Sequence, residues 1–163
     1  MTTTPTLQRL LTVRQSSFGD MECSIQGTSL RKCQKSRLGL PEVVFQVRVT
    51  IVNRRGWTFH STLRDVARLH SRLLATVQDN EFTDQLGSLV CPTQPWFGRK
   101  NAAVIKGMCC DLDHYLSNLL RICQRFILKA TRDEAIAVES TIRSFLNPST
   151  ISPMDAKSKD KPI

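Results

Sequence analysis

Basic side chains recur at a spacing that suits phosphate binding in the first half of the chain. Arg64, Arg68 and Arg72 follow one another at intervals of four residues, so a helix over this segment places them in one column. Arg54 and Arg55 form a second basic pair, with turn-forming residues on both sides. Guanidinium groups bind phosphate oxygens through charge-assisted, bidentate hydrogen bonds. These five arginines are therefore the first candidates for contact with an anionic partner.

The charge of the whole chain supports the same class of partner. The chain has 163 residues and a net charge of +9. Residues 1–78 hold 12 Lys and Arg against 4 Asp and Glu, while residues 79–163 hold 11 against 10. Such an uneven field favours nucleic acid, an anionic membrane surface or an acidic protein. Nucleic acid is the weaker expectation, because no aromatic residues alternate with the basic ones as single-strand binding requires.

A second unusual stretch, CPTQPWFG, combines two prolines with two aromatic residues. Pro92 and Pro95 exclude a helix or a central strand, yet Trp96 and Phe97 follow them at once. Three interpretations stay open. The aromatic pair inserts into a membrane interface, the PxxP segment docks in a partner's groove as a polyproline II helix, or the aromatic pair folds back onto the next helix.

The residues that could support catalysis form no recognisable site. The six cysteines include no CxxC pair and no histidine at zinc-ligand spacing, so we expect reduced thiols and no metal. Of the three histidines, His114 lies near Cys109, but proximity in sequence is not the geometry of a nucleophile and its base. P-loop, dinucleotide, HExxH and nucleophile-elbow motifs are absent from the sequence. We expect a protein that is not an enzyme and has no cofactor.

The elements that must position these residues begin with a sheet. Residues 42–51 alternate between apolar and polar side chains, which predicts a half-buried strand. The turn formers of residues 53–56 connect it to a second strand that carries Trp57 and Phe59, so the two arginines are expected at a hairpin tip. Residues 21–29 predict a weaker strand, with Gly27 at a β-bulge. The result is a three-stranded antiparallel sheet.

Helical periodicity follows the sheet. It covers residues 63–77, with Ser61 or Thr62 as the N-cap, and returns over residues 104–123. Residues 78–100 show no pattern and are expected to form a long irregular loop around the PxxP motif. Thr131 and Glu134 form a capping box that opens a helix ending near Leu146, before Asn147 and Pro148. The predicted fold is α+β: a three-stranded antiparallel sheet packed on a helical subdomain of three or four helices.

Four segments in this order resemble the PX (phox-homology) domain, the phosphoinositide-binding module of sorting nexins. They are the hairpin leading into LRDVARLHSRL, the PTQP loop with its aromatic pair, the helix LDHYLSNLL and the terminal SFL, which together span about residues 21–146. The resemblance implies a peripheral membrane-targeting module in trafficking or signalling that binds phosphatidylinositol lipids. It implies a pocket between the first helix, the PxxP loop and the next helix, and a loop tip that enters the membrane.

At the positions that match the phosphate-binding residues of PX domains, this chain has residues of other types. The arginine and stacking aromatic at the start of the first helix fall on Thr62 and Leu63, the lysine of the PxxP loop on Gln94, and the arginine of the next helix on Met108. The resemblance therefore implies weak or atypical lipid binding; the alternative is a protein-interaction scaffold of PX fold without specific lipid binding. Besides the five arginines, basic candidates near these positions are His60, Arg99, Lys100 and Lys106.

The ends of the chain differ from its centre in composition. Residues 1–19 predict a disordered N-terminal arm, with a mitochondrial presequence as the alternative, residues 20–147 the PX-like domain, and residues 148–163 a disordered tail. No apolar run is long enough for a transmembrane helix. We expect a cytoplasmic protein, peripheral on endosomal or other anionic membranes.

Overall fold

The sheet has three antiparallel strands, as predicted. The computed structural model describes residues 18–32, 41–95, 98 and 100–148. After a short 3₁₀ helix η1 (Phe18–Asp20), the strands are β1 (Met21–Lys32), β2 (Pro41–Ile51) and β3 (Arg54–Ser61), in the order β1-β2-β3. The register of β1 on β2 shifts between Ile25 and Gly27, which confirms the predicted bulge.

The hairpin between β2 and β3 turns earlier than the sequence suggested. Ile51 pairs with Arg54, so the turn consists of two residues, Val52 and Asn53. Asn53 has φ of 60°, in the left-handed region that asparagine tolerates better than most residues. The expectation of two arginines at the tip was therefore wrong, because Arg54 and Arg55 already belong to β3.

Two of the predicted helices begin at the expected caps. Helix α2 (Leu63–Thr76) has Thr62 as its N-cap, and Thr62 and Asp65 form a reciprocal capping box. Helix α5 (Arg132–Leu146) begins after Thr131, whose side chain accepts a hydrogen bond from the backbone N–H of Glu134.

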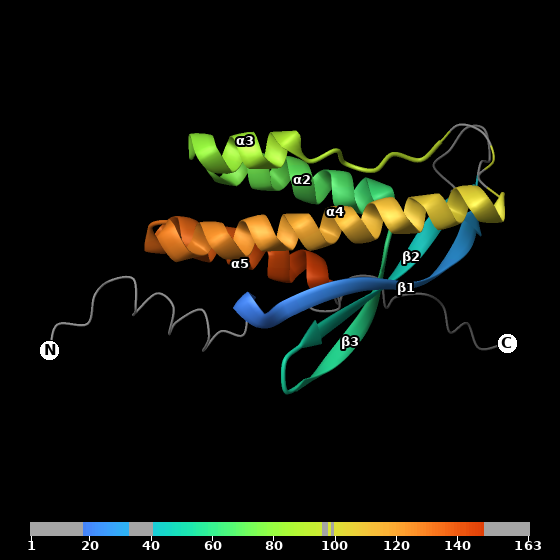
Figure 1. Cartoon of the computed structure of the whole chain (residues 1–163), viewed down its shortest axis with the longest axis horizontal. Helices are drawn as coiled ribbons and strands as arrows, with labels where there is room; N and C mark the ends of the chain where they lie inside the picture. The colour runs from blue at the N-terminus through green and yellow to red at the C-terminus, as the bar shows by residue number, and fades with distance from the viewer. Residues whose placement is uncertain (1–17, 33–40, 96–97, 99, 149–163) are drawn as a thin grey trace, which may run out of the picture.

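Two helices differ from the sequence prediction. Helix α3 (Asn80–Ser88) occupies part of the segment predicted to be irregular. Its signal is weak because it buries only Phe82 and Leu86, although Asp79 caps it. Helix α4 (Ala102–Lys129) has 28 residues, and it is capped by Asn101 and continues past the predicted end at Cys123. At about 1.5 Å per residue α4 is about 42 Å long, so it spans the whole molecule (Figure 1).

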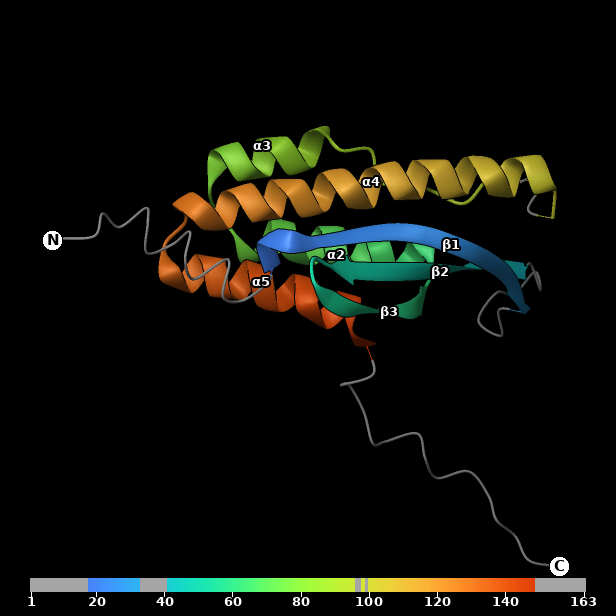
Figure 2. The same cartoon turned by 60° about the horizontal axis from the view of Figure 1, so that its bottom comes forward.

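The core lies between the sheet and the helices. Phe45, Val47 and Val49 of β2 are fully buried, together with Leu112 and Leu119 of α4. Helices α3 and α4 lie on one side of the molecule and β3 on the other, as both views show (Figures 1 and 2). The structure is therefore an α+β fold with one sheet and four α-helices in its described part, as the sequence predicted.

Helix α4 is tied to β1 by polar side chains as well as by packing. Asp113 Oδ1 accepts a hydrogen bond of 3.1 Å from the backbone N–H of Ile25, at the bulge. Gln124 Nε2 donates to the carbonyl oxygens of Phe18 and Met21 at 2.9 and 3.0 Å. These bonds fix the outer edge of β1 against α4. Within the ranges described, no helix is both long enough and apolar enough to cross a membrane.

Candidate functional site

The predicted basic residues lie in three separate places rather than on one surface. Arg54 and Arg55 begin β3, next to the hairpin turn, whereas Lys100 and Lys106 lie at the start of α4. The hairpin turn is at the far end of β2 from Pro41, whose carbonyl contacts the loop that leads to α4. A strand of 11 residues is roughly 35 Å long. The two basic groups therefore cannot contact the same small ligand, and Arg99 lies outside the described residues.

The structure does bring together three predicted residues, His60, Arg68 and Arg72. They line a cleft of about 250 Å³ between the end of β3, the exposed side of α2 and the last turn of α5. We call it the basic cleft. Its remaining lining residues are Phe59, Ser61, Asp65, Leu69, Ser144, Phe145 and Pro148.

The basic cleft has an excess of positive charge. Its one carboxylate, Asp65, accepts a hydrogen bond of 3.1 Å from the backbone N–H of Thr62 and lies 3.5 Å from the Arg68 guanidinium. Asp65 therefore caps the helix and neutralises part of the Arg68 charge. No carboxylate of the described residues forms an ion pair with Arg72. Arg64, one turn before Arg68, is also exposed, so the basic column of α2 faces solvent along its length.

The four positions at which the resemblance to PX domains places phosphate-binding residues have structural roles in this chain. Thr62 is buried and caps α2, and Leu63 and Met108 belong to the hydrophobic core. Gln94 Nε2 donates a hydrogen bond of 3.2 Å to the carbonyl oxygen of Pro41, which ties the PxxP loop to the start of β2. None of these four side chains carries a charge that could bind phosphate.

The PxxP loop is described only in part. Pro92 and Pro95 are half-buried, while Trp96 and Phe97 lie outside the described residues. The membrane-insertion prediction for these two aromatic residues therefore stays a prediction. At the start of the loop, Cys91 is half-buried and packs against the hydrophobic core.

Tyr115 is the centre of a buried polar contact. Its hydroxyl lies 2.7 Å from Nδ1 of His70, so α2 and α4 are joined at this side chain. Burial lowers the pKa of His70 and raises the pKa of Tyr115 and of the Cys91 thiol. The three groups are thus neutral at pH 7, and their geometry suits a structural joint better than a charged binding site.

The other candidate for chemistry, Cys109 with His114, lacks the environment of a nucleophile. Burial raises the pKa of the Cys109 thiol, and Cys110 and Asp113 raise it further, which disfavours the reactive thiolate. The Nε2 atom of His114 instead lies 3.0 Å from the side-chain nitrogen of Asn118. Among the residues placed by the structure, no three His, Cys, Asp or Glu side chains are arranged to hold a metal ion.

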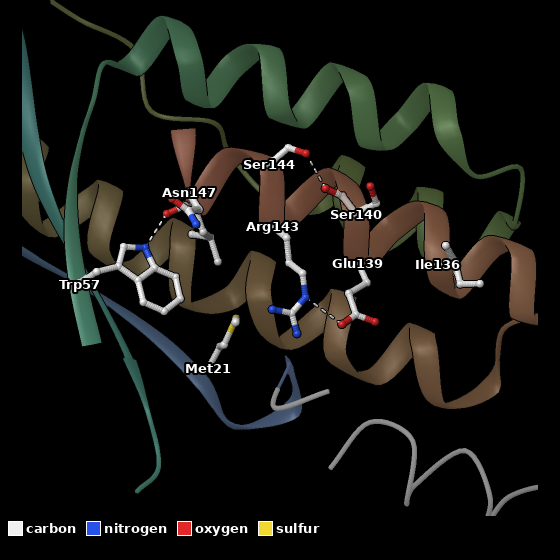
Figure 3. Close-up of a pocket in the computed structure, with 9 residues that line it drawn as sticks. Met21, Trp57, Ile136, Glu139, Ser140, Arg143, Ser144 and Asn147 are labelled. Atoms are coloured by element: carbon white, nitrogen blue, oxygen red, sulfur yellow. Dashed lines mark hydrogen bonds and ion pairs between the residues drawn. The ribbon is translucent and has the colours of Figure 1, made fainter. Parts of the chain in front are cut away.

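A second, larger cleft was not predicted from the sequence. It has a volume of about 410 Å³ and lies beside the Trp57 indole, between β3, the start of β1 and the outer side of α5 (Figure 3). We call it the Trp57 cleft. The Arg143 guanidinium lies in its centre and pairs with Glu139 at 2.9 Å. The alternation of β3 predicted Trp57 on the buried face of the sheet, and local spacing cannot show that this residue is only half-buried.

No protein-family model matches the sequence, and no curated protein matches it.

Proposed function

We propose that the chain is a PX-like domain that binds anionic membrane surfaces peripherally, with endosomal membranes as the expected location. The contact is weak or atypical and uses the basic side of α2 rather than the pocket of the PX family. The observation that carries the proposal is the basic cleft, where Arg68, Arg72 and His60 lie together with a single carboxylate. Phosphatidylinositol phosphates and other anionic lipids supply the complementary charge.

The order of elements supports the PX-like part of the proposal. A three-stranded antiparallel sheet precedes α2, and a proline-containing connection from Leu89 to Asn101 separates α3 from α4. Both features are ones that the resemblance to PX domains implies. The family's pocket positions support the atypical part, because Leu63 and Met108 are buried in the core.

The expected strength of membrane binding follows from the number of arginines on the exposed side of α2. Arg64, Arg68 and Arg72 are all exposed on α2. A basic residue near an anionic leaflet contributes about 1 kcal/mol, so three give weak recruitment that falls as salt screens it. A phosphoinositide that fits the basic cleft would add specificity to this attraction.

A second candidate function is a protein-interaction scaffold of PX fold without specific lipid binding. It is favoured by Thr62, Leu63 and Met108, whose capping and packing roles leave nothing for a head group at the family's pocket.

Liposome sedimentation separates the two functions. Each phosphoinositide is compared with phosphatidylserine vesicles of equal surface charge. Binding to one phosphoinositide above the serine control supports a head-group site, and equal binding to all anionic vesicles leaves charge alone. No binding to any vesicle at low salt removes the lipid proposal and leaves the scaffold. The double change Trp96→Ala and Phe97→Ala tests separately whether the loop tip contributes.

A further inference from the structure

Strand β3 has an open edge, and the hydrogen bonds of its neighbours show which backbone groups face it. The N–H of Ile25 bonds to Asp113 of α4, so it points away from β2. Because hydrogen-bonding direction alternates along antiparallel strands, its partner Val47 directs its N–H and C=O groups toward Phe59 of β3. Thr58 and His60, on either side of Phe59, therefore direct their backbone groups outward.

A second observation agrees with this assignment. A Cβ atom built on Gly56 would lie 2.3 Å from the carbonyl oxygen of Val49. The Val49 carbonyl therefore points toward β3, as expected for a residue two positions from Val47. Both observations therefore indicate that Trp57 and Phe59 direct their backbone N–H and C=O groups toward β2, and that Thr58 and His60 direct theirs outward.

The outward groups of β3 have no partner in the described part of the chain. Thr58 and His60 are both exposed, and none of the hydrogen bonds formed by the described residues uses their outward N–H or C=O groups. Strand β3 is one of the two edge strands and lies on the side of the molecule away from α4 (Figures 1 and 2). Strand β1, in contrast, uses its outer edge to bond to α4 through Asp113. An open edge of this kind is a template for another extended chain.

The two clefts lie along this edge at the repeat of a β-strand. Trp57 lines the Trp57 cleft and Phe59 lines the basic cleft. The two residues are two positions apart and face the same side of the sheet. Ser144, in the last turn of α5, borders both clefts. An added strand would therefore direct side chains i and i+2 into the two clefts.

We infer that β3 binds an extended acidic peptide, which adds a fourth strand and places an apolar side chain in the Trp57 cleft and an Asp or Glu side chain in the basic cleft. Backbone bonds to Thr58 and His60 supply affinity, and the two clefts supply specificity, as in other cases of strand addition. Arg68 and Arg72 select the acidic residue. Arg54 and Arg55 at the other end of β3 favour further acidic residues there.

The same charges disfavour a second copy of this chain as the occupant. If β3 paired antiparallel with β3 of another copy, Arg54 and Arg55 of one copy would lie near Arg68 and Arg72 of the other. Like charges placed directly across such an interface are repulsive. An acidic peptide can form backbone hydrogen bonds with the same edge of β3 without this repulsion.

The test is selection of random eight-residue peptides on the intact protein, with Thr58→Pro as the blocked variant. Because the N–H of Thr58 points outward, proline removes an edge donor and leaves the β2 ladder intact, as is usual on edge strands. We expect the wild-type protein to enrich peptides with an apolar and an acidic residue two positions apart, and Thr58→Pro to lose that enrichment without a large change in Tm. Equal enrichment on both proteins, or none on the wild type, overturns the inference.

A second variant tests the basic cleft without relying on proline. The double change Arg68→Glu and Arg72→Glu should switch the selected residue from acidic to basic, whereas Arg64→Ala, outside both clefts, should leave the selection unchanged. If the charge reversal does not change the selected peptides, the basic cleft does not bind the acidic residue and this part of the inference is overturned. Light scattering of the free protein tests whether a second copy of the chain binds β3 instead of a peptide. A concentration-dependent dimer that Thr58→Pro abolishes would show this and overturn the inference. Vesicle binding is measured separately, so either proposal can fail alone.

Discussion

The indole N–H of Trp57 donates a hydrogen bond of 2.7 Å to the carbonyl oxygen of Leu146 (Figure 3). This bond joins β3 to the last residue of α5, and the two bonded residues are 89 positions apart in sequence. Beside it, the rings of Phe59 and Phe145 meet edge to face at 5.5 Å. The end of α5 is therefore fixed beneath β3, and this arrangement separates the basic cleft from the Trp57 cleft.

Replacing Trp57 by phenylalanine should weaken this junction. The substitution keeps an aromatic ring and removes the indole N–H, so a loss of about 1 kcal/mol in the free energy of unfolding is expected. Urea denaturation measures it. Thr58→Val, at an exposed site of the same strand, is the control and should change stability by less than about 0.5 kcal/mol. Equal stability of Trp57→Phe and wild type would show that the bond contributes nothing net.

Gly56 should not tolerate a side chain. Its Cβ would lie 2.3 Å from the Val49 carbonyl oxygen, and since that atom belongs to the backbone of β2 it cannot move without distorting the sheet. We expect Gly56→Ala to cost about 1–3 kcal/mol. Gly87→Ala is a matched control, because its Cβ meets nothing within 4 Å and the site is an exposed position in α3. The free energy of unfolding of Gly87→Ala should rise by about 0.5–1 kcal/mol. Thermal unfolding of both variants measures the difference between them.

The arginine column of α2 should dominate binding to anionic vesicles. Changing Arg64, Arg68 and Arg72 together to alanine removes about 3 kcal/mol at about 1 kcal/mol each, which is roughly a hundredfold loss of affinity. The charge-matched control is the triple alanine variant of three exposed arginines on α4 and α5, namely Arg121, Arg125 and Arg132. Sedimentation with phosphatidylserine vesicles compares them. Similar losses in the two triple variants would mean that net charge alone drives the binding.

The stability of the fold should fall at mildly acidic pH because of His70. Burial lowers its pKa in the folded chain below the ordinary value of 6.5, so below that pH the unfolded chain binds the proton more strongly. His70 then favours unfolding as the pH falls below about 6.5 and has no such effect above it. We expect His70→Gln to reduce the loss of stability between pH 7 and pH 5, measured by urea denaturation. Identical pH dependence in both proteins would contradict this role.

Local signals were sufficient for most of the elements. The alternation over β2, the caps at Thr62 and Thr131, and the stop at Asn147 and Pro148 all act between neighbouring residues, and the structure confirms each of them. Helix α3 was missed because two buried side chains in nine residues are too few for a periodic pattern. The hairpin turn was placed too late, because Val52 is not a typical turn residue and hides the role of Asn53.

The sequence by itself determined the fold class, the basic half of the chain and the column Arg64, Arg68, Arg72, since each depends on composition or on spacing within one element. Tertiary structure alone decided which basic residues share a site. Arg72 and His60 line the same cleft because α2 and the last turn of α5 pack beside the end of β3, whereas Arg54 lies near the opposite end of that strand. Neither the open edge of β3 nor the two clefts can be read from local spacing, because the edge follows from the strand order of the sheet and the clefts form where α5 packs against β3.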